Sequence, residues 1–158
     1  GGDDVGNYAS IVTDDQDRPH IAYWNASERT PQYAWFDGSG WRIETVEDDP
    51  AVLIGQFTSL QLDELGRPSV ASYVFSNGDL KYAAKRDQAW RIQIVDGETQ
   101  RVGNHAALVL DSEGHPRIAY YSETRMALRY AEGTEVIATE SISFGALRAR
   151  YASPPTPR

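Results

Sequence analysis

Three segments of this chain each carry an aromatic residue with an amide or a carboxylate close behind it. They are Trp24 with Asn25, Tyr73 with Asn77, and Tyr121 with Glu123. An aromatic ring can stack on a sugar ring while polar neighbours hydrogen-bond to the sugar hydroxyls, so these six residues are candidate ligand contacts. The same rings could instead close the ends of hydrophobic cores between sheets, and the sequence leaves both interpretations open.

Catalytic chemistry has less support in the residue pattern. Glycoside cleavage usually needs two positioned carboxylates, whereas sialidases use a tyrosine nucleophile with a glutamate and substrate-binding arginines. The chain has many Tyr, Glu and Arg residues, but most of its tyrosines recur at regular positions, as packing residues do. It contains neither a GxSxG elbow nor a phosphate-binding glycine loop. We therefore expect no catalytic residue in this chain and no cofactor.

The composition of the chain limits the kinds of partner that we expect it to bind. The 158 residues carry a net charge of −8 and no cysteine, and the acidic balance argues against nucleic acid, which is bound by basic surfaces. No apolar run approaches the ~20 residues of a membrane-spanning helix. The chain opens on Gly1-Gly2-Asp3-Asp4 with no signal peptide. Because it begins almost on the boundary of an internal repeat, we expect that upstream sequence has been removed.

The elements that would position these residues come from an internal repeat of about 48 residues. Gly6, Gly55 and Gly103 open its three copies. Each copy reads as short strand-like runs rich in Val, Ile, Tyr and Trp, separated by turn residues. Self-similarity at this period predicts an all-β fold made of β-propeller blades, here three four-stranded antiparallel repeats.

Recurring residues inside the copies predict a core. Tyr33, Tyr82 and Tyr130 fall at one phase of the repeat, and Trp41 and Trp90 at another. We expect all five to be packed between sheets. His105 occupies the position of Tyr8 and Phe57 and is interpreted as a stand-in for an aromatic ring.

The turn between the first two strands has the form DxxGxP, in which the Asp side chain caps the turn and Gly takes a positive φ. It occurs at 63–68 and 111–116, and Asp17 replaces the glycine in the first copy. Asp14, Asp15 and Asp17 could alternatively be calcium ligands, but the other copies keep only the first carboxylate. The histidines lack zinc spacing. We expect no metal site.

The repeat boundaries predict one propeller-type domain over residues 1–151, with blades at about 6–54, 55–102 and 103–144. The third copy departs from the pattern, and we place its fourth strand at 136–140 and a possible extra strand at 145–151, ahead of a Pro-rich tail at 152–158. Closed propellers have about 4 to 8 blades. The chain should thus be a partial propeller within a longer protein, or half of a homodimeric six-bladed ring.

The pattern GxxxSLxLDxxGxPxIAYY, followed by LKYA and a Trp-led run, resembles a repeat of uncharacterised bacterial exported proteins placed with the sialidase-like β-propellers. The resemblance covers about Gly6 to Tyr130. It implies an extracellular or periplasmic location and a non-catalytic recognition or scaffold module that binds carbohydrate or protein. The alternative is a fragment of a sialidase-like glycoside hydrolase whose catalytic residues lie outside this chain.

Overall fold

The structure is a computed structural model that describes residues 2–49, 54–97, 101–133 and 148–151. Within these residues the chain forms only β-strands, turns and bends, and its twelve strands make three antiparallel sheets of four. The prediction of an all-β fold of propeller-type blades is confirmed. The predicted tail at 152–158 and the predicted fourth strand at 136–140 lie outside the described residues.

Each sheet corresponds to one copy of the repeat. The strands of blade 1 are β1 (Val5–Thr13), β2 (Pro19–Asn25), β3 (Thr30–Phe36) and β4 (Trp41–Thr45). The strands of blade 2 are β5 (Ile54–Leu62), β6 (Pro68–Val74), β7 (Asp79–Arg86) and β8 (Ala89–Asp96). The strands of blade 3 are β9 (Val102–Leu110), β10 (Pro116–Ser122), β11 (Ala127–Glu132) and β12 (Arg148–Tyr151).

The fourth strand of blade 3 corrects one expectation. Residues 145–151 were expected to supply an extra strand beyond the third blade, but β12 pairs with β11 and completes blade 3 itself, with Ala131 opposite Ala149. The sequence pattern did not predict this pairing, because the Trp-led run that marks the fourth strand in the first two copies has no counterpart in the third.

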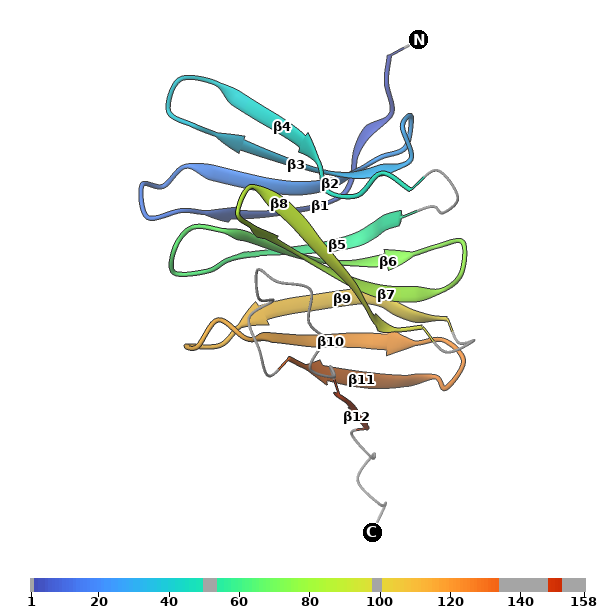
Figure 1. The fold of residues 1–158 in the computed structure, drawn as a ribbon. Coiled ribbons are helices and arrows are strands. Elements are labelled where there is room, and N and C mark those ends of the chain that lie inside the picture. The colour runs from blue at the N-terminus through green and yellow to red at the C-terminus, as the bar shows by residue number, and fades with distance from the viewer. Residues whose placement is uncertain (1, 50–53, 98–100, 134–147, 152–158) are drawn as a thin grey trace.

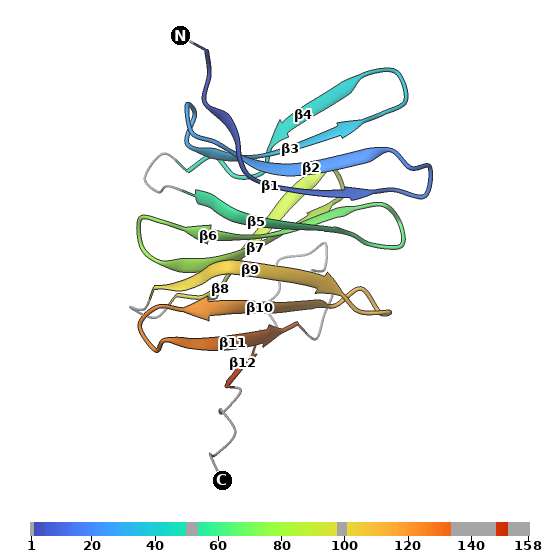
Figure 2. The ribbon, with the colours of Figure 1, turned by 180° about the vertical axis from the view of Figure 1, so that it is seen from behind.

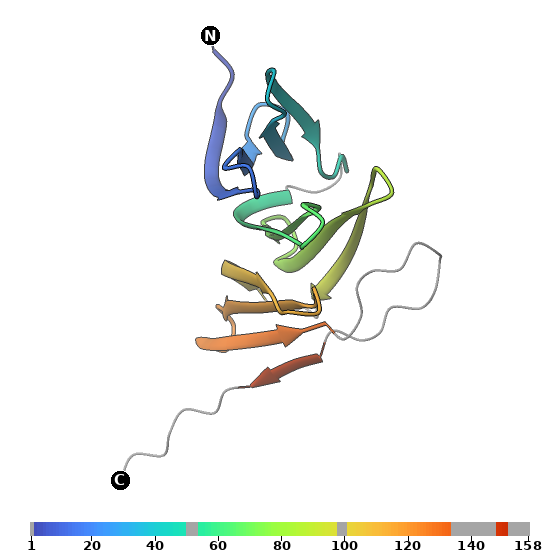
Figure 3. The ribbon, with the colours of Figure 1, turned by 90° about the vertical axis from the view of Figure 1, so that its left-hand side faces the viewer.

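The blades follow one another in a row, with blade 2 between blades 1 and 3 (Figures 1 and 2). The first strands β1, β5 and β9 lie next to one another, and the sheets fan outward from them (Figure 3). Two hydrophobic cores fill the interfaces between neighbouring blades. These interfaces are named here the first joint, between blades 1 and 2, and the second joint, between blades 2 and 3. Ala22, Tyr33, Leu60 and Val70 contribute to the first joint. Leu80, Tyr82, Leu108 and Ile118 contribute to the second.

Burial follows the position of the blade as well as the phase of the repeat. Tyr33 and Tyr82 are buried as expected, whereas Tyr130 is half-buried because no described residue of a further blade covers it. The expectation for the tryptophans is wrong in part: Trp90 is half-buried against the first core, but Trp41 is 52% exposed. Trp41 lies on the face of blade 1 that is turned away from blade 2.

The β1–β2, β5–β6 and β9–β10 connections are the predicted Asp-capped turns. The Oδ1 atom of Asp63 accepts the amides of Leu65 and Arg67, and Gly66 has a φ of 71°. Asp14 and Asp111 cap their turns in the same way. Asp17, which replaces the glycine, has a φ of 58°. These turns define one end of the blades, named here the turn end.

Candidate functional site

The six residues predicted to contact a ligand gather at the opposite end of the blades, named here the loop end. It holds the β2–β3, β6–β7 and β10–β11 connections and the beginnings of β1, β5 and β9. Trp24, Tyr73 and Tyr121 are equivalent in the three blades, each near the end of the second strand. The alignment of the repeat therefore located one common end of the structure.

The three aromatics differ in exposure. Trp24 and Tyr73 are only 6% and 2% exposed, whereas Tyr121 is 38% exposed. A side chain added at Gly55 would lie 3.1 Å from a ring carbon of Trp24, so blade 2 packs tightly on this ring. Trp24 and Tyr73 thus have the packing role that the sequence left open. Tyr121 is exposed because it lies on the face of blade 3 turned away from blade 2.

The polar candidates shape the loops. Asn25 accepts the amide of Glu28 at 3.0 Å, and Asn77 accepts that of Asp79 at 3.3 Å. Glu123 accepts a hydrogen bond from the side-chain amide of Asn104 and lies 3.7 Å from Arg101. Asn25 is buried, whereas Asn77 is exposed and Glu123 half-buried. Asn77 and Glu123 are therefore the polar candidates that solvent reaches.

A column of aromatic rings crosses the loop end. The repeat alignment matched these residues but did not predict that their rings contact one another. The ring centroids of Tyr8 and Phe57 are 4.7 Å apart, and those of Phe57 and His105 are 4.5 Å apart. All three residues have a positive φ, between 52° and 55°, which is costly for residues of this size. His105 does replace an aromatic ring, as expected. The motifs GNY, GQF and GNH were the available signal.

An amide precedes each ring of the column. Asn7, Gln56 and Asn104 lie opposite Trp24, Tyr73 and Tyr121, respectively, across the first strand pair of each blade. Asn7 donates to Asp4 at 2.9 Å. The Oδ1 atom of Asn104 is buried and has no hydrogen-bond partner in the described part of the chain. The loop end thus combines closely spaced, tilted rings with amide groups that can both donate and accept hydrogen bonds.

Ion pairs also cross both joints near the loop end. Lys81 of blade 2 lies 2.6 Å from Glu47, which follows blade 1, and the equivalent Arg129 of blade 3 pairs with Asp96 of blade 2. The hydroxyl of Tyr120 also donates to Asp96, at 2.7 Å. Burial raises the pKa of the nearby Asp79 carboxyl, which Lys81 opposes and Asp96 reinforces. These pairs tie neighbouring blades together.

Sialidases also use a tyrosine, an acid and arginine. Here Tyr120 is 1% exposed, and the side chains of Asp96 and Arg129 are nearly as buried. The three groups contact one another rather than opening on solvent. This grouping therefore joins blades 2 and 3.

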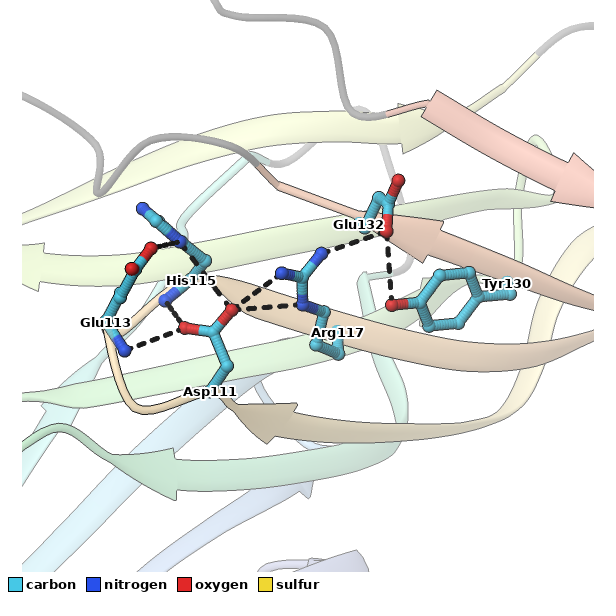
Figure 4. Close-up of polar contacts among 6 residues, drawn as sticks. All are labelled: Asp111, Glu113, His115, Arg117, Tyr130 and Glu132. Carbon is cyan, nitrogen blue, oxygen red and sulfur yellow. Dashed lines mark hydrogen bonds and ion pairs between the residues drawn. The ribbon is translucent and has the colours of Figure 1, made fainter.

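A second polar network lies at the turn end of blade 3 (Figure 4). Arg117 lies between Asp111, at 2.7 Å, and Glu132, at 3.0 Å, and the Tyr130 hydroxyl is 3.4 Å from Glu132. The backbone amide of His115, followed by Arg117, lowers the pKa of the Asp111 carboxyl to about 2. Asp111 is therefore ionised at neutral pH and anchors the turn instead of donating a proton.

Asp14, the first of the three candidate calcium ligands Asp14, Asp15 and Asp17, binds groups of its own turn. Its carboxylate accepts backbone amides of Gln16 and Arg18 and pairs with the Arg18 guanidinium at 2.6 Å, and these hydrogen bonds hold its pKa well below the usual range. The described residues contain no group of three or more His, Asp or Glu side chains arranged to hold a metal ion. Nor do they form a helix that could span a membrane.

The sequence matches no family model and no curated protein sequence. Among solved structures, the fold is similar to that of a fucose lectin from Kordia zhangzhouensis in complex with methyl-fucoside, with a TM-score of 0.52. The identity is 14%, and the alignment covers 81% of this chain and 93% of the lectin chain. At this identity the likeness shows the fold alone. The resemblance to sialidase-like repeats stays a prediction.

Proposed function

We propose that this chain is a non-catalytic, lectin-like module that binds carbohydrate at the loop end of its blades. The observation that carries the proposal is the repeated pairing of a ring with an amide: Tyr8 with Asn7, Phe57 with Gln56, and His105 with Asn104. Rings stack on the apolar face of a pyranose, and amides hydrogen-bond to its hydroxyls. The backbone strain repeated at all three rings is typical of positions kept for a function.

The candidate residues around this column complete the proposed surface. Asn77 and Glu123 reach solvent at the same end of the blades, and Tyr121 adds a further ring in blade 3. The buried residues Trp24, Asn25 and Tyr73 would not contact the sugar but would hold the loops and the joints in place. The fucose lectin of similar fold supports a sugar ligand. Because the chain carries a net charge of −8, neutral sugars suit it better than sialylated or other acidic ones.

An extracellular or periplasmic location, where glycans are accessible, belongs to the same proposal. A protein ligand at the loop end is the alternative to a glycan. The two differ in what should bind: a lectin binds an isolated sugar or oligosaccharide, with no protein attached.

The test is titration calorimetry with methyl-fucoside, preceded by a neutral-glycan array to select further ligands. Variants in blade 2 are the most informative, because this blade has a neighbour on each side within one chain. Phe57→Leu and Gln56→Ala should each weaken binding about three- to tenfold, since a ring contact or a hydrogen bond contributes about 1 kcal/mol. Asn77→Ala should weaken it by a similar factor.

Leu65→Ala is the matched control, because Leu65 is exposed in the same blade but at the turn end. It should bind as the wild type does. Folded Phe57→Leu and Gln56→Ala variants with wild-type affinity would move the site elsewhere. Binding of no glycan on the array would refute the lectin function and favour a protein ligand.

A further inference from the structure

Blades 1 and 3 each expose an apolar face. The equivalent faces at the two internal joints are packed against a neighbouring blade. On the face of blade 1 turned away from blade 2, Ile11 and Ile43 are each 63% exposed and Trp41 is 52% exposed. On the face of blade 3 turned away from blade 2, Val109 is 55% and Leu128 60% exposed, and Tyr121 lies beside them. These surfaces are named here outer face 1 and outer face 3.

The two internal joints show what such faces contact. At the second joint the backbone of Gly103 packs on Leu80, so closely that a side chain added at the glycine would lie 2.9 Å from the Leu80 Cβ. At the first joint the equivalent Gly55 packs on Pro31. Leu80 also shares a core with Val102. Each joint thus brings the start of one blade's first strand against the third strand of the blade before it.

Among the described residues, the repeat equivalents of these residues have no such partner at the ends of the row. Leu128 corresponds to Pro31 and Leu80, Gly6 to Gly55 and Gly103, and Val5 to Val102. No described atom lies within 4 Å of the position of a side chain added at Gly6, and both Val5 and Leu128 are exposed. Outer face 3 therefore presents one half of a joint, and outer face 1 presents the other half.

Two aromatic contacts repeat the same pattern. Trp90 packs edge-on against Tyr33 across the first joint, with 5.7 Å between centroids. Their equivalents Trp41 and Tyr130 lie on outer faces 1 and 3. The column of Tyr8, Phe57 and His105 likewise ends on an exposed ring at each side. A blade 1 seated on outer face 3 would extend the column from His105 to the next Tyr8.

We propose that outer face 3 binds outer face 1 of a second copy of this chain, and that two copies close one six-bladed ring through two identical joints. Closed propellers have about 4 to 8 blades, and two is the number of three-bladed copies that falls within this range. In each joint Leu128 contacts Val5 and Gly6 of the second copy, and Tyr130 contacts its Trp41.

This joint differs from the internal ones in two ways that should make it weaker. Ser10 and Ser59 accept amides of the following blade, from Leu60 at 3.1 Å and Leu108 at 2.9 Å, but the equivalent residue on outer face 3 is Ala107. The cations Lys81 and Arg129 of the internal joints correspond to the neutral Gln32 in blade 1. The closed ring should therefore dissociate on dilution before its blades separate within a chain.

The mass of the whole chain by light scattering after size exclusion tests the proposal. Wild type should have twice the mass of the 17.6 kDa chain. Leu128→Glu and Val5→Lys alone should each be monomeric, because each places an unpaired charge in both joints. Mixed in equal amounts they should dimerise again, since the mixed dimer has one Glu–Lys joint and one wild-type joint. This rescue is specific to a contact between residues 128 and 5.

Two further variants strengthen the test. Ile94→Glu changes an exposed residue of the middle blade and should leave the dimer intact. Ala107→Ser supplies the missing acceptor for Ile11 of the second copy and should lower the dimer dissociation constant about thirtyfold, because each of the two joints gains one hydrogen bond. A monomeric wild type with cooperative unfolding would overturn the proposal and indicate blades of a longer chain as the occupant. Dimers that persist in both single variants would also overturn it.

Discussion

Ser59→Ala should destabilise the chain by about 1 to 3 kcal/mol, even though it removes a single oxygen atom. Ser59 Oγ accepts the amide of Leu108 across the second joint at 2.9 Å. Leu108 is 2% exposed, so water cannot replace the lost acceptor. Leaving a buried N–H unpaired costs about 1 to 3 kcal/mol, more than the net value of the hydrogen bond itself. Ser10→Ala should have a similar effect, because Ser10 accepts the amide of the buried Leu60.

The assay is urea unfolding at a fixed protein concentration, followed by the fluorescence of the four tryptophans. In a parallel heating experiment, the thermal midpoint should fall by roughly 2 to 4 °C for each kcal/mol in a chain of this size. Ser112→Ala is the control, because Ser112 is exposed in the β9–β10 turn, and it should change stability by less than about 0.5 kcal/mol. A Ser59→Ala variant as stable as this control would refute the role assigned to the serine.

Two further predictions concern packing and pH. Gly103→Ala should cost about 1 to 3 kcal/mol more than Gly38→Ala in the same unfolding assay, because both glycines have a φ near 100° but only the Gly103 side chain would press on Leu80; equal losses would contradict the tight joint. The contribution of Asp111 should be complete above its unfolded pKa of 3.8 and disappear as the pH falls through its folded pKa of about 2. Urea midpoints that fall equally with pH in wild type and Asp111→Asn would contradict this.

The architecture could be predicted from the sequence because its signals are local and repeated. Each DxxGxP turn caps itself within six residues, and the strands on either side alternate in the same phase in every copy. Agreement among three copies then compensates for the weakness of each single pattern. The common loop end of Trp24, Tyr73 and Tyr121 followed from the same alignment.

Burial could not be predicted in this way, because it depends on which neighbour a blade has. Trp41 and Trp90 have the same phase, yet Trp90 contacts Tyr33 of blade 1 whereas Trp41 lies on an outer face. For Trp24 and Tyr73 the sequence left two interpretations open, ligand contact or core, and their burial in the structure favours the core. The aromatic column was missed for a related reason: its rings are separated by about one whole repeat and meet only when the blades stack.

Binding of carbohydrate at the loop end is tested most directly by mapping backbone amide chemical shifts of the ¹⁵N-labelled chain during titration with methyl-fucoside or the best glycan from the array. The shifts should concentrate at Gly55 to Phe57 and around Asn77, with little change at the turn-end glycines Gly66 and Gly114. Shifts centred on those turn-end glycines, or no shift with any glycan, would contradict the proposed site and function.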